Sequence, residues 1–113
     1  MKLIMQEDEG ERISNVRGGT GDGKIFKASL PEKDGSFTLA SRIELSPGAS
    51  IGLHQHTDDN EIYAVVSGEG IYSFDGGERE LKTGDIFVTL KGMSHALKNT
   101  GNIKLIFFAI VAR

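Results

Sequence analysis

The sequence of 113 residues contains no cysteine and only three histidines. The lack of cysteine excludes disulfide scaffolds, thiolate zinc sites, iron–sulfur clusters and cysteine nucleophiles. A large excess of charge of either sign is also lacking, because the sequence has 13 Lys and Arg and 16 Asp and Glu, for a net charge of -3. This balance, with no basic run, argues against binding to nucleic acids or to anionic membranes.

Long hydrophobic runs are absent, and no apolar stretch reaches the length that spans a membrane. The apolar start Met1–Met5 is too short for a signal peptide, and the charged segment Gln6–Glu9 follows it directly. We therefore expect a soluble, cytoplasmic protein. The length predicts a single domain over residues 1–113.

Short segments rich in β-branched and aromatic residues alternate with glycine-containing turns. Residues of one parity in Phe37–Leu45 are mostly apolar, which is typical of a strand with one buried face. The pair Asp75-Gly76 predicts a hairpin, because glycine readily adopts the positive φ of such turns. The segments expected as strands are Lys24–Leu30, Phe37–Leu45, Glu61–Val66, Ile71–Phe74, Ile86–Leu90 and Ile103–Val111. This pattern predicts an all-β antiparallel sandwich or barrel.

A glycine-rich segment, Gly18–Lys24, has the spacing of a phosphate-binding loop up to its lysine. Such a loop requires Ser or Thr after the lysine and then a helix that faces the phosphates. Ile25 follows instead, and its neighbours are typical of a strand. We therefore interpret this segment as a flexible turn.

The three histidines and one glutamate are placed as a set of metal ligands would be. His54 and His56 are two residues apart, so in a strand their imidazoles project to one side. The polar connection at residues 57–60 allows the chain to fold back, which brings Glu61 beside them. His95 follows another turn with glycine and can arrive from a neighbouring strand. Three imidazoles and one carboxylate suit a divalent first-row transition metal.

The spacing around these residues resembles the two signature motifs of the cupins. The first is Gly48-(five residues)-His54-Gln55-His56-(four residues)-Glu61-(six residues)-Gly68, and the second is Gly84-(five residues)-Leu90-Lys91-Gly92-(two residues)-His95-(three residues)-Asn99. The one departure is Leu90, where the family usually has proline. This change removes a φ constraint from the turn but touches no ligand.

The resemblance implies a double-stranded β-helix, a jelly-roll barrel of six to eight strands. Its core would span residues 36–113, and residues 1–35 would form an N-terminal arm and strand. By this resemblance His54, His56, Glu61 and His95 bind one divalent ion of Mn, Fe, Ni or Zn, and Asn99 supports the strand of His95. It also implies a homodimer, in which Lys24–Leu30 is the candidate strand to pack on the partner.

Four protein ligands leave about two positions open on an octahedral ion, enough for a bidentate small molecule. The resemblance thus implies a metal-dependent enzyme that acts on a small oxygen-rich organic molecule, by dioxygenase, isomerase or decarboxylase chemistry. The alternative is a non-catalytic module that binds a metal or a small molecule. Oxalate-degrading cupins usually carry an arginine in the strand before the first histidine. The segment Ser50–Leu53 has none, which weakens the decarboxylase interpretation.

Several nearby residues have two interpretations each. Tyr63 shares strand parity with Glu61 and is the one catalytic candidate, although a core tyrosine explains it equally well. Asp58 and Asp59 either orient a ligand imidazole or are solvated loop residues. Arg42 either holds a substrate carboxylate or faces solvent. A final apolar set either walls a dry pocket or packs in the core: Phe87, Val88, Leu97, Phe107 and Phe108.

Overall fold

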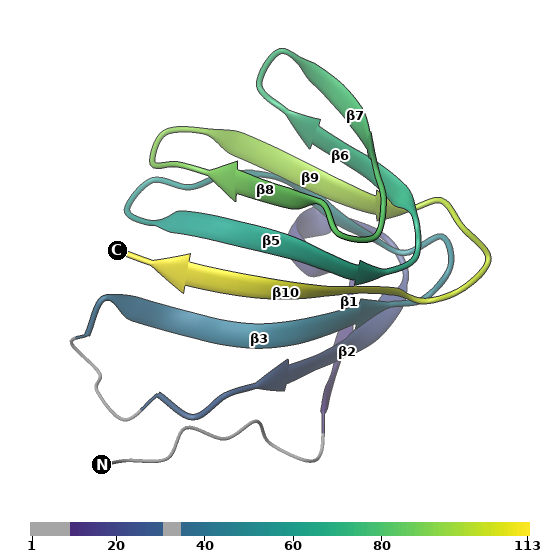
Figure 1. Cartoon of the computed structure of the whole chain (residues 1–113), viewed down its shortest axis with the longest axis horizontal. Coiled ribbons are helices and arrows are strands. Elements are labelled where there is room, and N and C mark those ends of the chain that lie inside the picture. The colour runs from purple at the N-terminus through teal and green to yellow at the C-terminus, as the bar shows by residue number, and fades with distance from the viewer. Residues whose placement is uncertain (1–9, 31–34) are drawn as a thin grey trace.

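The computed structural model describes residues 10–30 and 35–113, and it folds them into two antiparallel sheets (Figure 1). The elements are, in chain order, β1 (Glu11–Ser14), the 3₁₀ helix η1 (Val16–Gly18), β2 (Asp22–Lys27), β3 (Phe37–Leu45), β4 (Ser50–Gln55), β5 (Asn60–Ser67), β6 (Gly70–Phe74), β7 (Gly77–Leu81), β8 (Ile86–Thr89), β9 (Ser94–Asn99) and β10 (Leu105–Ala112). No helix within the described ranges is long and apolar enough to cross a membrane.

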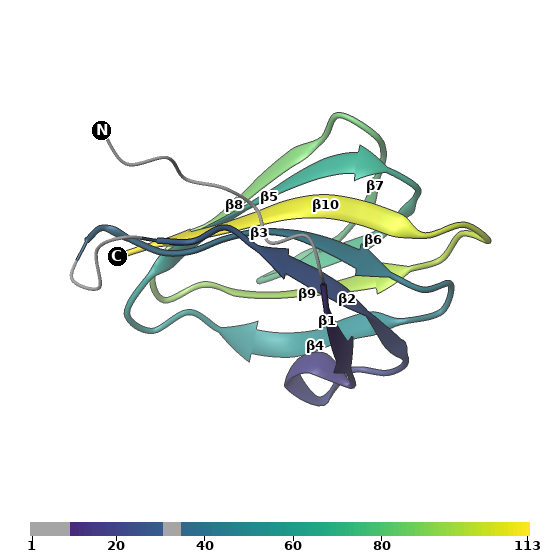
Figure 2. The ribbon, with the colours of Figure 1, turned by 90° about the horizontal axis from the view of Figure 1, so that it is seen from below.

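The larger sheet contains six strands in the order β1-β2-β3-β10-β5-β8, and the smaller contains four in the order β4-β9-β6-β7. The smaller sheet faces the larger one across the core, as Figures 1 and 2 show. The arrangement is the predicted all-β jelly roll. The described residues form ten strands, more than the six to eight expected, partly because the short β1 adds an edge strand to the larger sheet.

The core lies between the two sheets and follows the two-residue period of the strands. In β10, Leu105, Phe107, Ala109 and Val111 are buried, whereas the residues between them face outward. The expected pattern is confirmed in the second half of β3, where Ile43 and Leu45 are buried on its inner side, whereas Phe37 at the other end is exposed. The buried Ser41 of this strand donates a hydrogen bond to the carbonyl of Ala109, at 2.9 Å.

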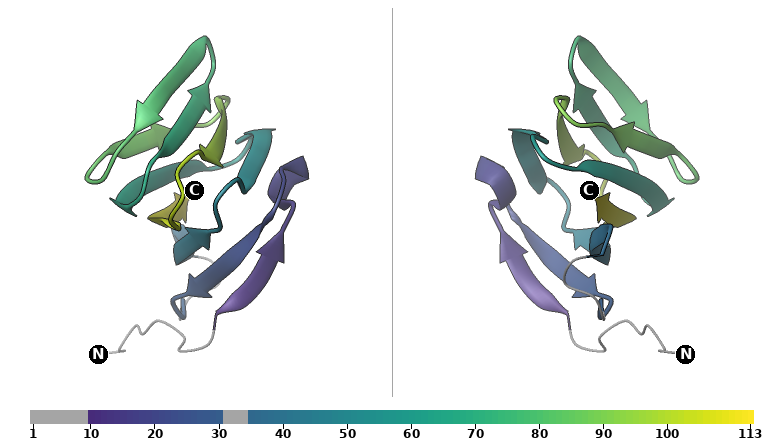
Figure 3. Two further views of the ribbon diagram at one scale, coloured as in Figure 1. Left: turned by 90° about the vertical axis from the view of Figure 1, so that its right-hand side faces the viewer. Right: turned by 90° about the vertical axis from the view of Figure 1, so that its left-hand side faces the viewer.

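The N-terminal part of the chain extends the larger sheet. The strand expected at Lys24–Leu30 is β2, which starts two residues earlier, ends at Lys27 and pairs with β3 of the same chain. Figure 3 shows the β1–β2 hairpin at the end of the molecule opposite to β6 and β7. Residues 1–9 and 31–34 of the expected arm lie outside the described residues. Segment Gly18–Lys24 leads into this strand and not into a helix, in keeping with a turn.

Two turns show how local sequence shapes the barrel. The hairpin predicted at Asp75-Gly76 joins β6 to β7, and Gly76 has φ of 93°. The turn with Leu90 in place of proline closes all the same, because Met93 N donates to the carbonyl of Leu90 at 2.9 Å and Gly92 has φ of 87°. The second motif therefore keeps its turn without the φ constraint of proline.

Candidate metal centre

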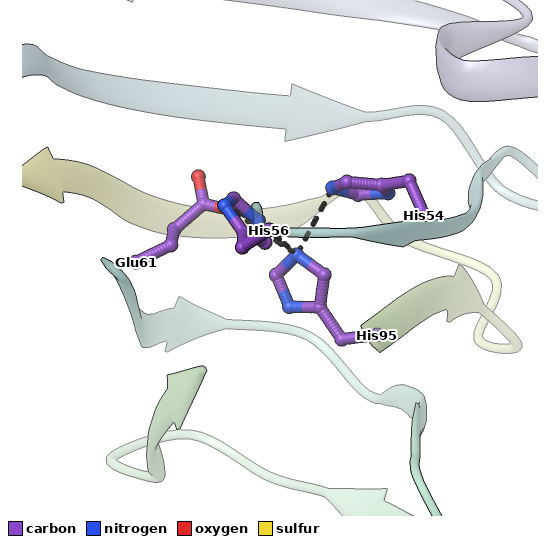
Figure 4. Close-up of side chains that lie close together, drawn as sticks. All are labelled: His54, His56, Glu61 and His95. Carbon is purple, nitrogen blue, oxygen red and sulfur yellow. Dashed lines mark hydrogen bonds and ion pairs between the residues drawn. The ribbon is translucent and has the colours of Figure 1, made fainter. Parts of the chain in front are cut away.

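The structure brings the four predicted ligands together at one end of the barrel. His54 comes from β4, His56 from just after it, Glu61 from the start of β5 and His95 from β9. One potential ligand atom from each of these residues lies within 4.8 Å of all the others. Figure 4 shows the ring of His95 pointing toward the rings of His54 and His56, with Glu61 on the far side of His56.

Strand pairing explains this convergence. His54 lies directly opposite His95 in the β4–β9 pair, so their side chains share one face of the smaller sheet. Glu61 projects inward from the larger sheet, where its partner on β8 is Thr89. His56 is held by two backbone bonds, from its own N to the carbonyl of Met93 at 3.0 Å and from Gly92 N to its carbonyl at 2.6 Å. Both sheets therefore contribute ligands.

Two of the histidines are fixed in a known tautomer. Nδ1 of His54 lies 2.8 Å from the carbonyl oxygen of Gly52, which only accepts hydrogen bonds. Nδ1 of His56 lies 2.6 Å from Oδ1 of Asp59, which accepts as a carboxylate. Both neutral rings therefore carry their proton on Nδ1, and both present the lone pair of Nε2 to the cluster.

His95 is oriented by hydroxyl groups. Its Nδ1 lies 2.8 Å from Oγ1 of Thr89 and 3.2 Å from the hydroxyl of Tyr72, and these two hydroxyls also hydrogen-bond each other. All three groups are buried. This network turns Nε2 of His95 toward the other two imidazoles, as the supporting bonds of metal-binding histidines do.

The distances between the donor atoms fit a bound cation. Nε2 of His95 lies 3.0 Å from Nε2 of His56 and 3.1 Å from Nε2 of His54. Oε1 of Glu61 lies 3.0 Å from Nε2 of His56 and 3.1 Å from Nε2 of His95. Metal–nitrogen bonds of about 2.1 Å at right angles separate neighbouring donors by about 3.0 Å. Lone pairs that face one another at this distance repel unless a proton or a metal cation lies between them.

The electrostatics keep His54 in the form that binds a metal. Burial lowers its pKa below the ordinary value of 6.5, and the charges of His95 and Arg17 lower it further, against the raising effect of the Gly52 bond. Glu61, His56 and His95 are buried, and His54 is half-buried. A neutral imidazole with one face toward the surface is suited to binding an ion that also meets a ligand from solvent.

Tyr63 is both a core tyrosine and a neighbour of the cluster. It is buried, and its ring stacks on that of His95 with 4.8 Å between the centroids. Burial raises the pKa of its hydroxyl well above the ordinary value, and the charge of Glu61 and a hydrogen bond to that carboxylate raise it further. The hydroxyl therefore stays protonated and donates to Glu61. The two interpretations of this residue are compatible.

The structure separates the remaining candidates. Asp59 binds the ring of His56, whereas Asp58 is exposed in the connection. Arg42 lies outside the cluster, because it alternates with the buried Ser41 and Ile43 and so faces outward. There it forms an ion pair with Glu44, at 3.3 Å from Nε to Oε2, and covers the ring of Phe26.

The apolar residues expected to wall a pocket lie in two different places. Leu97 and Phe107 are core residues, and Phe87 packs against the core and stacks on Tyr72. The pocket-wall interpretation is wrong for Val88 and Phe108, which are exposed, because their positions in β8 and β10 face outward from the larger sheet. Core packing therefore accounts for the inward-facing members of this set.

Three neighbours of the cluster carry no signal in the sequence motifs. Thr89 and Tyr72 meet His95 only because three strands bring them together. Arg17 lies far away along the chain, in η1, and its charge acts on both His54 and Tyr63. No residue spacing in the sequence points to any of these three contacts.

Comparison with known proteins identifies the family. A model of the cupin domain matches residues 41–111. The chain belongs to the cupin family. This cupin is 41% identical over 104 residues to the oxalate-binding protein of Thermotoga maritima, covering 89% of this chain and 84% of that protein. It is 32% identical over 88 residues to an auxin-binding protein of Prunus persica, covering 74% of this chain and 42% of that protein.

Solved structures agree with this assignment. The crystal structure of a predicted oxalate decarboxylase from Thermotoga maritima matches this cupin with a TM-score of 0.91 and 36% identity, covering 98% of both chains. KdgF from Halomonas matches with a TM-score of 0.68 and 22% identity, covering 80% of this chain and 79% of that one. The second likeness concerns the fold alone.

Proposed function

We propose that this cupin binds one divalent transition-metal ion, Mn, Fe, Ni or Zn, through His54, His56, Glu61 and His95. The observation that carries the proposal is the convergence of three Nε2 atoms and one carboxylate oxygen, in which neighbouring donor atoms lie 3.0–3.1 Å apart. This donor set of imidazole nitrogen and carboxylate oxygen suits divalent first-row metals. The bound ion would act as a Lewis acid that holds anionic oxygens.

The ligand we propose is a small dicarboxylate of the oxalate type. Glu61 cancels one of the two charges of a divalent ion, so the three neutral histidines leave the site positive. Four protein ligands leave about two positions open on an octahedral ion, which match the two oxygens of a chelating ligand. The names of the two Thermotoga proteins, one oxalate-binding and one a predicted oxalate decarboxylase, support this choice.

We propose further that the cupin is an enzyme acting on this oxygen-rich ligand. The likeness to a predicted oxalate decarboxylase places decarboxylase-type chemistry ahead of the dioxygenase and isomerase classes, even though Ser50–Leu53 lacks the arginine usual in oxalate-degrading cupins. Tyr63 is the candidate for a catalytic role, because its protonated hydroxyl is hydrogen-bonded to Glu61 at the edge of the cluster. The alternative is a module that binds oxalate without turning it over. The name of the first relative, which mentions binding alone, favours that alternative.

The experiment has two stages. The protein is purified without chelators, and its metal content is measured by elemental analysis before and after incubation with Mn²⁺, Fe²⁺, Ni²⁺ and Zn²⁺. We expect uptake of about one equivalent of at least one of these metals. Less than about 0.1 equivalent for all four metals would refute metal binding.

Oxalate is then titrated into the loaded protein by calorimetry, and formate is measured as the product of decarboxylation. Binding with formate release supports the enzyme, and binding without release of any product supports the binding module. A panel of dicarboxylates, thiols and diketones tests the other two reaction classes. A loaded protein that binds no member of the panel would contradict both versions of the proposal.

We also propose a homodimer that buries the outer face of the larger sheet. Two apolar rows cross this face: Phe108 lies beside Ala64, which lies beside Ile86, and Ile110 lies beside Ile62, which lies beside Val88. The exposed fraction is 67% for Ile86 and 53% for Val88. Continuous apolar patches of this kind on soluble proteins mark interaction surfaces. In a twofold dimer the same surface patch of each copy meets its equivalent, so two apolar faces of this kind cover each other. This favours a second copy as the occupant.

Light scattering after size exclusion tests the dimer. Val88→Lys should convert the dimer to a monomer, because it places a charge inside the buried face. Ile103→Lys is the matched control, since Ile103 is equally exposed, at 56%, but lies in the β9–β10 turn. A monomeric parent protein, or a dimer that survives Val88→Lys, would contradict this interface. The cytoplasmic location stays a prediction.

A further inference from the structure

The backbone that carries Arg17 runs in direct contact with β4, the strand that carries His54. Ser50 N donates to the carbonyl of Thr20 at 2.7 Å, and Thr20 N donates to Oγ of Ser50 at 2.9 Å. Further along, a Cβ on Gly52 would lie only 2.2 Å from the carbonyl oxygen of Arg17. Gly52 is therefore required for this contact. The carbonyl of Gly52 is the acceptor for the ring of His54, so the backbone of Arg17 lies against the residue that orients this ring.

The backbone of Arg17 is strained. Its φ of 54° and ψ of 36° lie in the left-handed region, as does the φ of 48° at Asn15. Within the described ranges these are the only residues other than glycine with positive φ. A conformation of this kind costs on the order of 1–3 kcal/mol and persists where the surroundings impose it, most often at functional sites. Here the surroundings include β4, where Gly52 lies against the carbonyl of Arg17.

The guanidinium of Arg17 is exposed, and it forms no hydrogen bond or ion pair with another residue of the described ranges. Its charge is one of the smaller influences on His54 of β4 and on the buried Tyr63 of β5, where it adds to the lowering of the pKa of His54 and partly offsets the raised pKa of Tyr63. The charge of Arg17 therefore acts on one residue from each of the two sheets that contribute to the cluster. A cation next to a metal site is unfavourable by itself, because like charges repel. An anion between the two removes this repulsion.

We propose that Arg17 binds the outward-facing oxygens of a small dicarboxylate whose other oxygens bind at the cluster of His54, His56, Glu61 and His95. This inference rests on the proposed function and adds a specificity-determining residue to it. A dicarboxylate that chelates an ion with one oxygen of each carboxylate keeps two oxygens directed away. The planar fork of a guanidinium matches a pair of such oxygens. Arg17 thereby favours dianions over neutral ligands of the metal.

The test compares oxalate with imidazole, a neutral metal ligand, on Mn²⁺-loaded protein. In Arg17→Gln we expect oxalate to bind about tenfold more weakly, a loss of about 1.4 kcal/mol, while imidazole binds as in the parent protein. Metal content after the titration should stay at one equivalent. Arg12→Gln is the matched control, because Arg12 is also an exposed arginine of the N-terminal segment but pairs with Asp22 at 3.0 Å. It should bind oxalate like the parent protein.

Two further measurements test the role of the Arg17 guanidinium. Arg17→Lys retains the charge and loses the fork, so its oxalate affinity should lie between those of the parent protein and Arg17→Gln. The tenfold difference should also shrink at 1 M salt, because the guanidinium is exposed. Equal oxalate affinity in the parent protein and both Arg17 variants would overturn the role of Arg17 and leave the metal site intact. A failure to take up metal would overturn the proposed function itself, and this inference with it.

Discussion

The carboxylate of Asp59 accepts a hydrogen bond from the ring of His56, with 2.6 Å between Oδ1 and Nδ1. His56 is buried, whereas Asp59 is part-exposed in the turn that leads into β5. The bond fixes the tautomer of His56 and directs its Nε2 toward Glu61, 3.0 Å from Oε1. Asp59 is none of the fixed positions of the two cupin motifs, and it nevertheless orients one of the four proposed ligands.

Asp59→Asn should weaken metal binding about 10- to 100-fold, because removal of the group that orients a ligand histidine typically has an effect of that size. Asp58→Asn is the control, since it makes the same change in an exposed neighbour that makes no contact with the cluster. Competition with a chromogenic chelator measures both affinities. Equal affinities for the two variants would contradict the role given to Asp59.

Thr89→Val should lower both metal affinity and stability. The substitution keeps the shape of the side chain but removes the hydroxyl that lies 2.8 Å from Nδ1 of His95. This leaves the buried ring with Tyr72 as its sole partner at Nδ1, and the loss of such a bond costs about 1–2 kcal/mol. Urea unfolding of the metal-free protein measures the stability, and chelator competition measures the affinity. A variant as stable as the parent, with the same affinity, would show that the hydroxyl network is dispensable.

Asn99→Ala should destabilise the barrel without removing a ligand. The amide of Asn99 is fully buried, and it donates to the carbonyls of Leu45 at 3.1 Å and Ile103 at 2.9 Å. It also accepts from Gly101 N at 2.9 Å, so truncation removes three hydrogen bonds, of which the bond to Leu45 is fully buried. We expect a loss of about 3 kcal/mol in the free energy of unfolding, against less than about 0.5 kcal/mol for the exposed Asn102→Ala. A loss below about 1 kcal/mol in Asn99→Ala would contradict this account.

Acid should weaken metal binding, because protons compete with the metal for the imidazole nitrogens. Burial lowers the pKa of His54 below 6.5, so this ring is neutral at pH 7 and takes up a proton only at more acidic pH. The dissociation constant should therefore change little between pH 7 and pH 8 and rise as the pH falls below 6.5. Calorimetric titrations at each pH measure it. Affinity that is constant down to pH 5 would indicate a site without histidine ligands.

Much of the barrel is predictable from local patterns. The two-residue period of Phe37–Leu45 and the glycine of the Asp75-Gly76 turn depend on neighbours in the chain, so the sequence contains the whole signal. Likewise, the spacing of His54, His56 and Glu61 predicts their convergence, because one strand and one turn join them. The four motif glycines, Gly48, Gly68, Gly84 and Gly92, all have positive φ.

The supporting contacts are not predictable in the same way. Thr89 and Tyr72 reach His95 from β8 and β6, and this meeting depends on the register of strands that are distant in sequence. Arg17 approaches β4 through a left-handed backbone, which nothing in its residue type favours. The predicted bounds of β2 are also wrong, because pairing with β3 and not residue propensity decides where this strand ends.

X-ray absorption spectroscopy of the protein loaded with one equivalent of Zn²⁺ tests the metal centre most directly. We expect three imidazoles and at least one oxygen bound to the zinc, at about 2.0–2.2 Å. In His54→Ala the imidazole contribution should fall by one third, with the remaining ligands in place. A spectrum with fewer than two imidazoles, or one that is unchanged in His54→Ala, would contradict the proposal that His54, His56, Glu61 and His95 hold the metal.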